Sequence, residues 1–266
     1  MKKKKKIVAL IYDFDNTLIN CDMQNITLAK ELAGSVEAFW ARANGFMIDN
    51  DVDEVLSYLY MSNVMAKEKG IKFTKEYLAE HGKKINAYFA GVETWFDRIN
   101  AYASDMGVEL KHYVISAGFQ DMVDNCSIAK NFEKIFACRY VYDASGEVLW
   151  PAYVVNYSQK IQYIARIRKN LTENLRDSKG VNTKVGKKDQ YISYDRMIYL
   201  GDGVTDVPGM KMIKQMGGHS ICVYDKTKES AKRLLRDKRV DYVVPADYTE
   251  GSLLDKRIKY IIKNMK

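Results

Sequence analysis

The chain has 266 residues, of which 47% are hydrophobic and 29% charged, so it can bury the core of one large domain or of a domain with an insert. Three prolines and sixteen glycines are too few for a collagen-like or linker-rich protein. No apolar run approaches the ~18 residues of a membrane span. The net charge is +8, but Lys2–Lys6 supply five of these charges at one end, so the balance does not demand a nucleic-acid partner.

The first residues of the chain and its cysteines bear on where in the cell the protein is expected to lie. The basic start and the apolar run Ile7–Tyr12 resemble a secretion signal, but the run stops at Asp13, short of the ~7–15 apolar residues that such a signal needs. The four cysteines form no Cys-x-x-Cys pair, and the three histidines are equally dispersed. These patterns favour reduced thiols in the cytoplasm and predict neither a disulfide framework nor a zinc site.

Hydrophobic periodicity predicts a strand at Ile7–Tyr12, a helical insert over about 20–90, and then alternating helices and strands. From residue 91 we expect helices at 92–106, 119–130, 158–175, 206–216, 228–236 and 250–263, strands at 111–116, 135–142, 197–201, 220–224 and 240–244, and a turn at 143–146. This alternation is typical of an α/β fold with a doubly wound, mainly parallel sheet. We therefore assign 1–19 and 91–266 to an α/β core and 20–90 to a helical insert.

Two other segments invite a binding role that we do not favour. The insert carries an apolar and aromatic stripe at helical spacing, which is more typical of core packing than of a ligand box. The basic segment Arg176–Gln190 follows a helix and precedes a strand, so it lies at the amino-terminal edge of the sheet, away from the edge where α/β sheets bind ligands. We expect it to be a solvated or mobile loop.

The sequence Asp13-Phe14-Asp15-Asn16-Thr17 follows the first strand. In extended backbone, residues two apart face the same way, so both carboxylates can enter one cavity. One could then be a nucleophile and the other a general acid and base. The alternative is a turn or a helix N-cap, for which Asp, Asn and Thr are all suited.

Two later segments offer groups that could meet an anion. Ser116 ends the second strand, and the backbone amides of Ala117 and Gly118 would open the next helix beside it, although a serine in this position, taken alone, is more often a simple helix cap. Lys160 lies in the first turn of a helix, where the helix dipole disfavours a cation. That local cost hints at an anionic partner, but exposed lysines are common.

The segment Gly201-Asp202-Gly203-Val204-Thr205-Asp206 adds two carboxylates at a third strand end. Mg²⁺ takes hard oxygen ligands, usually one or two carboxylates with water and phosphate, and Asp202 with Asp13 would meet that need. The alternative is a glycine-rich turn in which Asp206 caps the following helix.

Together these four segments resemble the four-motif signature of the haloacid dehalogenase (HAD) superfamily, and the insert resembles the helical C1 cap of its phosphoserine-phosphatase-like branch. The resemblance implies that Asp13 attacks phosphorus and forms an aspartyl phosphate. Asp15 would protonate the leaving oxygen and then activate water. The dehalogenases of the superfamily do not need an acid at this position. The phosphate would be bound by Thr17, Ser116, Ala117 and Gly118.

The resemblance also implies a Mg²⁺ cofactor. Its ligands would be Asp13, the backbone carbonyl of Asp15 and Asp202, with Asp206 supporting the metal from nearby. Lys160 would offset negative charge on the nucleophile and the phosphate. Phosphoryl transfer depends mainly on positioning and electrostatic stabilisation, so a carboxylate nucleophile beside a phosphate calls for both a divalent cation and a lysine.

The expected substrate is a small phosphorylated metabolite, with no membrane partner and an unassigned oligomeric state. In phosphoserine phosphatases an acid nine positions after the nucleophile binds the amine, and a cap arginine binds the carboxylate. Here Asp22 stands at that spacing, and Arg42 or Arg98 is a candidate arginine, which leaves serine phosphate in doubt. The alternatives are a catalytically silent binding module on the same fold and a 3′-phosphatase of nucleic-acid ends, which the cap disfavours.

Overall fold

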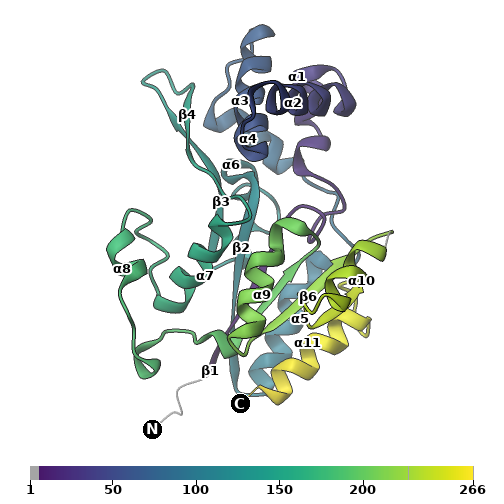
Figure 1. Ribbon diagram of the computed structural model, residues 1–266. Helices are drawn as coiled ribbons and strands as arrows, with labels where there is room; N and C mark the ends of the chain where they lie inside the picture. Colours follow the sequence, from purple (N-terminus) through teal and green to yellow (C-terminus); the bar gives the residue numbers. More distant parts are fainter. Residues whose placement is uncertain (1–5, 227, 266) are drawn as a thin grey trace.

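The computed structural model describes residues 6–226 and 228–265, so most of the basic N-terminal segment Lys2–Lys6 lies outside the described residues. A seven-stranded sheet in the order β4-β3-β2-β1-β5-β6-β7 runs through the molecule (Figure 1). All neighbouring strands pair in parallel except β3 and β4, which are antiparallel. The strands are β1 (Lys6–Tyr12), β2 (Val108–Phe119), β3 (Lys134–Tyr142), β4 (Val148–Tyr153), β5 (Met197–Gly201), β6 (His219–Tyr224) and β7 (Tyr242–Pro245).

Strand β1 lies at the centre of the sheet because its apolar residues can be covered on both faces. Residues 8–12 are fully buried. Tyr12 pairs with Val114 of β2 on one side and with Leu200 of β5 on the other. The strand order therefore reverses at β1, which creates the crevice in which α/β sheets bind ligands.

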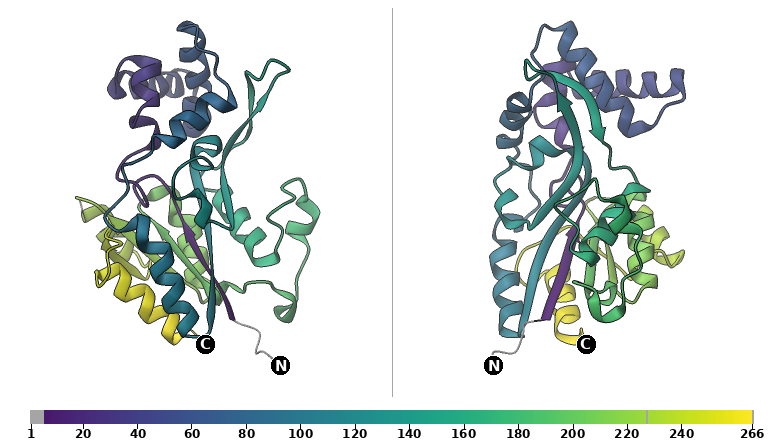
Figure 2. Two further views of the ribbon diagram at one scale, coloured as in Figure 1. Left: turned by 180° about the vertical axis from the view of Figure 1, so that it is seen from behind. Right: turned by 90° about the vertical axis from the view of Figure 1, so that its left-hand side faces the viewer.

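Helices cover both faces of the sheet (Figure 2). On one face α5 (Val92–Asp105) packs with α11 (Leu253–Asn264), and on the other α7 (Gln159–Lys169) packs with α9 (Val207–Gln215). A further helix, α10 (Glu229–Arg236), packs against β6 and β7. The indole N–H of Trp95 in α5 donates to the Tyr12 hydroxyl at 2.9 Å, so this buried hydroxyl at the end of β1 has a hydrogen-bond partner inside the core.

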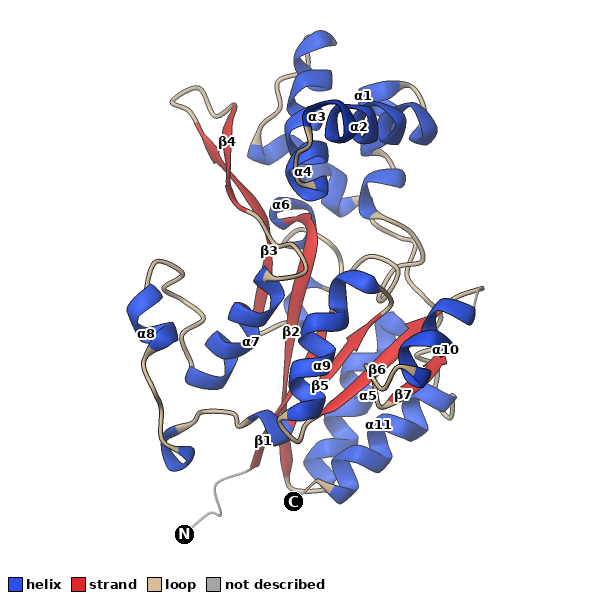
Figure 3. Cartoon of the chain, in the orientation of Figure 1, coloured by secondary structure: helices blue, strands red, loops and turns tan. Residues whose placement is uncertain are grey.

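The predicted helical insert lies beyond the carboxyl ends of the strands (Figure 3). It consists of a 3₁₀ turn at Met23–Asn25 and helices α1 (Leu28–Ala33), α2 (Val36–Asn50), α3 (Glu54–Glu68) and α4 (Lys75–Lys83). The side chains of Ser35, Asp53 and Thr74 cap the N-termini of α2, α3 and α4. The doubly wound sheet with a helical insert is the fold class that the sequence predicts.

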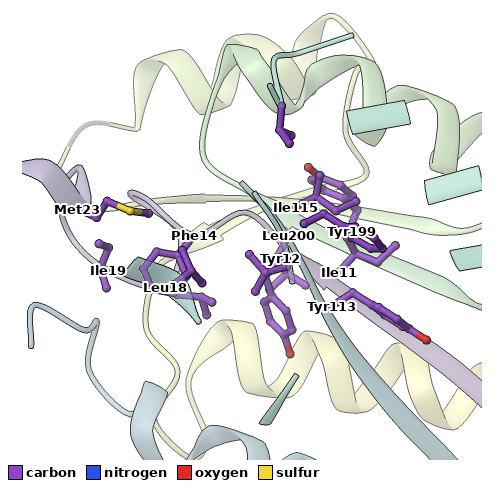
Figure 4. Close-up of a cluster of buried hydrophobic side chains, with 14 of the residues drawn as sticks. Ile11, Tyr12, Phe14, Leu18, Ile19, Met23, Tyr113, Ile115, Tyr199 and Leu200 are labelled. Carbon is purple, nitrogen blue, oxygen red and sulfur yellow. The ribbon is translucent and has the colours of Figure 1, made fainter. Parts of the chain in front are cut away.

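The apolar stripe of the insert is mainly core, as predicted. Val55, Leu59, Leu78, Ile85 and Phe89 are buried. The packing continues into the sheet, where side chains from β1 and the following loop meet residues of β2 and β5 (Figure 4). No helix within the described residues is long and apolar enough to cross a membrane.

Three element predictions were wrong. The helix expected at 119–130 is only α6 (Gln120–Val123) with a 3₁₀ turn at Ala129–Asn131, because the Asn125 side chain bonds the carbonyl of Asp121 in competition with the helix. The helix expected at 158–175 ends at Lys169, where Asn170 adopts φ 58°. Strand β4 was missed altogether.

The segment 176–190, predicted to be a loop, also contains short helical elements. It contains α8 (Ser178–Asn182) and a 3₁₀ turn at Lys187–Asp189. The ammonium of Lys169 donates to the carbonyls of Val181 and Thr183, which attaches the segment to the end of α7. Two further 3₁₀ turns, Tyr194–Arg196 and Val204–Asp206, flank β5.

Candidate active site

Asp13 is fixed at the carboxyl end of β1. Its backbone N–H donates to the Leu200 carbonyl at 2.9 Å, which extends the pairing with β5 by one residue. Its Oδ1 accepts from the Phe14 N–H at 2.8 Å, while Oδ2 lies 2.9 Å from the Lys160 ammonium. The side chain is therefore held at both oxygens and is almost completely buried.

The chain turns sharply after Asp13. The Leu18 N–H donates to the Phe14 carbonyl at 2.8 Å, and Asn16 adopts φ 54°, a conformation that asparagine tolerates better than most residues. Thr17 is fully buried, and its Oγ1 has no hydrogen-bond partner. A buried hydroxyl without a partner is costly. A phosphoryl oxygen bound beside the turn would supply the missing partner.

Lys160 is fully buried between two carboxylates. Its ammonium lies 2.9 Å from Asp13 Oδ2 and 2.6 Å from Asp206 Oδ1, and the Tyr199 hydroxyl donates to the same Asp206 oxygen at 2.8 Å. Burial alone would lower the pKa of Lys160, but the charges of Asp13 and Asp206 outweigh it and raise the pKa. The lysine stays charged, and its two anionic partners offset the unfavourable helix dipole at the start of α7.

The carboxylates of Asp13, Asp202 and Asp206 converge, with ligand oxygens within 4.8 Å of one another. Burial and the charge of Asp206 raise the pKa of Asp13 to about 7, and burial with the charges of Asp206 and Asp13 raises the pKa of Asp202 to about 8. One ammonium faces three carboxylates. This hard oxygen donor set with excess negative charge fits Mg²⁺.

Asp202 and Asp13 line the pocket, whereas Asp206 is fully buried behind them. Gly201 permits this arrangement, because a Cβ there would lie 2.3 Å from Asp206 Oδ2. Asp206 begins α9 but makes no side-chain capping bond, so the simple-cap alternative does not describe it. Its side chain instead pairs with the Lys160 ammonium.

Asp15 lies on the pocket wall, two residues after Asp13. Its Oδ1 accepts from the Met23 N–H at 3.0 Å. Burial, followed by the charges of Asp22 and Asp13, raises the pKa of Asp15 well above its ordinary range. A raised carboxyl pKa favours the protonated form, which is the form that can donate a proton to a leaving group.

Ser116 is buried in β2, three residues before the strand ends, with its Oγ accepting from the Gly118 N–H at 2.9 Å. The expectation that Ala117 and Gly118 open a helix was wrong, because β2 continues through Phe119 and α6 begins only at Gln120. Ala117 lines the pocket. The small residues at this strand end remain beside Asp13 and its neighbours, but without a helix terminus.

The pocket is a cavity of about 430 Å³, a size suited to a small molecule. Asp22 lines it, and its Oδ1 accepts from the Asn16 amide at 3.0 Å rather than capping the following turn. Arg42 is not part of the lining and instead pairs with Glu68 at 2.7 Å. Arg98 is also elsewhere, donating to the Tyr248 carbonyl. The structure therefore does not bring either candidate arginine to the pocket.

Comparisons with known proteins bear on the fold. No protein-family model matches the chain. An uncharacterized protein of Borreliella burgdorferi is 27% identical over 281 aligned positions, covering 96% of each chain. A HAD family hydrolase from Salmonella enterica serovar Typhi aligns with a TM-score of 0.63 and 16% identity over 99% of this chain and 74% of its own. A substrate-bound phosphoserine phosphatase aligns at TM-score 0.57 and 18% identity over 97% of this chain and 99% of its own.

The chain has the HAD-type fold. A phosphoserine phosphatase with a phospho-aspartyl intermediate analogue also aligns, at TM-score 0.54 and 19% identity, over 97% of this chain and 99% of its own. The resemblance stated from the four motifs is thus confirmed at the level of the fold.

Within this HAD-type fold, the pocket contains residues that the sequence did not single out. They come from the insert and share a polar or aromatic character: Gln24, Asn25, Trp40, Asn44, Glu54 and Tyr58. Tyr199, which holds Asp206, was also missed. A weak signal existed for Tyr199, since it precedes the motif at Asp202 by three residues, but an apolar strand gave no reason to assign it a polar contact.

Proposed function

We propose that the protein is a Mg²⁺-dependent phosphatase that hydrolyses a small phosphomonoester through an aspartyl phosphate on Asp13. The observation that carries the proposal is the buried contact of Lys160 with both Asp13 and Asp206, beside Asp202 and at the reversal point of the sheet. The phosphatase structures that share the fold support the same reaction class.

The chain's own groups can carry both halves of the reaction. An Asp13 oxygen attacks phosphorus while the bond to the leaving oxygen breaks, and protonated Asp15 gives its proton to that oxygen. Asp15, now ionised, then takes a proton from water as the water oxygen attacks the phosphorus, which releases phosphate and restores Asp13. Thr17 and Ser116 would donate to phosphoryl oxygens.

Lys160 offsets charge next to the nucleophile throughout, and Tyr199 and Asp206 hold it in place. Bound Mg²⁺, held by Asp13 and Asp202 with Asp206 nearby and the Asp15 carbonyl as the further expected ligand, would neutralise charge on the phosphoryl oxygens. The proposed metal role rests on the acidic donor set described above.

We further propose that 20–90 is a cap on a core of 1–19 and 91–266. In support, the two connecting segments run side by side, with the Asn20 N–H donating to the Ala87 carbonyl at 2.9 Å and the Phe89 N–H to the Leu18 carbonyl at 3.0 Å. The free thiols of all four cysteines agree with the expected cytoplasmic location.

Neither alternative gains support from the site. A silent binding module would be expected to lack one of the catalytic groups, whereas those of all four motifs are present. A phosphatase of nucleic-acid ends would need basic residues for the backbone, and the described residues that line the pocket include none.

The test is to trap the intermediate. Protein with Mg²⁺ and p-nitrophenyl phosphate is quenched and reduced with borohydride, which converts an aspartyl phosphate to homoserine. Mass spectrometry should find homoserine at position 13 in the wild-type protein and none in Asp13→Asn. Steady hydrolysis without a modified residue 13 would reject the proposed mechanism, and no hydrolysis of any phosphomonoester would reject the function.

A further inference from the structure

The part of the pocket beyond Asp13 and Asp202 has an unusual charge for a site that would accept a phosphate ester. Five carboxylates line the whole pocket: Asp13, Asp15, Asp22, Glu54 and Asp202. No lysine, arginine or histidine occurs among the described residues of the lining. A substrate with a carboxylate beyond its phosphate would therefore meet like charge with no counterion.

Two aromatic rings form part of the same wall. Trp40 and Tyr58 have ring centroids 5.8 Å apart and ring planes at 72°, so they meet edge to face. The Trp40 indole N–H is already used by Asn25 Oδ1 at 2.8 Å, and the Tyr58 hydroxyl by the Ala117 carbonyl. Because their polar atoms are occupied, these rings offer the pocket π-surface, which attracts cations.

Gln24 provides a second, independent observation. It lines the pocket, is only 2% exposed, and its Oε1 is buried without a hydrogen-bond partner. An unpaired buried acceptor costs free energy, and a ligand N–H would remove that cost. Exposed Glu54, in the first turn of α3, adds negative charge at the rim.

Resting on the proposed phosphatase function, we propose that the substrate is an aminoalkyl phosphate: a phosphomonoester with a protonated amine and no carboxylate. The amine lies against the pocket-facing surface of the Trp40 and Tyr58 rings and donates to Gln24 Oε1, with Asp22 and Glu54 supplying negative charge. Because Gln24 needs a donor, an amine with N–H bonds is preferred over a trimethylated one.

The test compares kcat/KM for 2-aminoethyl phosphate, its trimethylated analogue, O-phosphoserine, glycerol phosphate and p-nitrophenyl phosphate with the Mg²⁺-loaded enzyme. We expect 2-aminoethyl phosphate to exceed glycerol phosphate and O-phosphoserine by about 10- to 100-fold, the effect of one charge-assisted hydrogen bond. The trimethylated ester should lie between them. Glu54→Gln and Trp40→Leu should each reduce the preference for the amine over glycerol phosphate.

Glu93→Gln is the matched control, because Glu93 is also an exposed acid in the first turn of a helix but lies outside the pocket lining. It should leave the preference unchanged. Binding is measured separately by thermal shift, in which 2-aminoethylphosphonate should stabilise the protein more than propylphosphonate, which has a methyl group in place of the ammonium.

The outcomes separate the two claims. Hydrolysis of p-nitrophenyl phosphate with no preference for the amine, or with O-phosphoserine preferred, overturns the substrate class and leaves the phosphatase function standing. Stabilisation by the aminophosphonate without hydrolysis of any ester supports the binding site and overturns the phosphatase function. Equal stabilisation by both phosphonates overturns the amine site.

Discussion

Replacing Asp13 with asparagine should abolish turnover and at the same time stabilise the metal-free protein. Asparagine has no charge, so it resembles the protonated form of the acid, and it cannot attack phosphorus. In the folded protein the pKa of Asp13 is raised by burial and by Asp206 to about 7, from an ordinary value of 3.8. Folding therefore favours the uncharged form of this side chain.

The size of the effect follows from this pKa difference. Each pKa unit corresponds to about 1.4 kcal/mol, and the three acids share the repulsion, so the variant should gain roughly 2–4 kcal/mol in free energy of unfolding at pH 8. Because the pKa of Asp13 is higher in the folded than in the unfolded protein, this side chain does not destabilise the wild-type fold below about pH 4. Its ionisation lowers the free energy of unfolding progressively as the pH rises to about 7. The gain should be absent at pH 4 and constant above pH 7.

Urea unfolding in chelator at several pH values measures this gain, and Asp97→Asn, a change at an exposed position of α5, serves as the matched control. The control should alter neither stability nor turnover. If Asp13→Asn is less stable than wild type at pH 8, the electrostatic reasoning is wrong. If it keeps a tenth of the activity, Asp13 is not the nucleophile.

Three further changes test the rest of the site. Chelation should stop hydrolysis and Mg²⁺ restore it, with Ca²⁺ a poor substitute because its larger, looser shell misplaces the groups it binds; full activity in chelator would refute the metal assignment. Asp15→Asn should slow hydrolysis of alkyl phosphates by about 10²- to 10⁴-fold but p-nitrophenyl phosphate much less, since nitrophenolate leaves without a proton; equal losses would argue against a proton donor. Tyr199→Phe should lower kcat about tenfold with KM unchanged, because Asp206 loses a hydrogen bond and holds Lys160 less well; a change in KM alone would contradict that positioning role.

The strand ends could be predicted because topology alone brings them together. An unbroken apolar strand followed by Asp13 indicates a central parallel strand, and the polar residues after two later strands must reach the same edge of the sheet. Lys160 could also be singled out from the sequence, because a cation in the first turn of a helix is unfavourable and indicates an anionic partner. The resemblance placed Lys160 beside the nucleophile Asp13, but the second partner, Asp206, was expected only to support the metal and not to pair with the lysine.

The pocket wall could not be predicted because it depends on how the insert's helices are turned. Trp40 and Arg42 are two residues apart on α2, which places them about 200° apart around the helix axis. Arg42 was a candidate because of its charge, but it lies on the face of α2 that pairs with Glu68. Trp40 lies on the face that lines the pocket. Nothing in the local pattern decides between these faces, since half-buried aromatic residues and exposed ion pairs are both common on such helices.

Strand β4 was missed for a different reason. It contains Pro151 and exposes Leu149 and Trp150, so it lacks the alternation and hydrogen-bonding capacity of a typical internal strand. Proline is tolerated there because β4 is an edge strand, paired on one side by β3. The predicted turn at 143–146 was the better signal, because a turn directly after a strand favours a hairpin.

The same charge arrangement that suits the site to an aminoalkyl phosphate also limits what it can bind alone. With Lys160 buried behind Asp13, the pocket presents carboxylates to an incoming phosphate, and like charges at this distance repel. On the proposed function, phosphate affinity would then depend on a cation held by Asp13 and Asp202, whereas amine affinity would depend on Gln24, Trp40 and Tyr58 and would need no cation. The two ends of the proposed substrate would thus be bound by separate groups, one set at the strand ends and one on the insert, so substitutions in the insert would alter specificity without changing the catalytic residues.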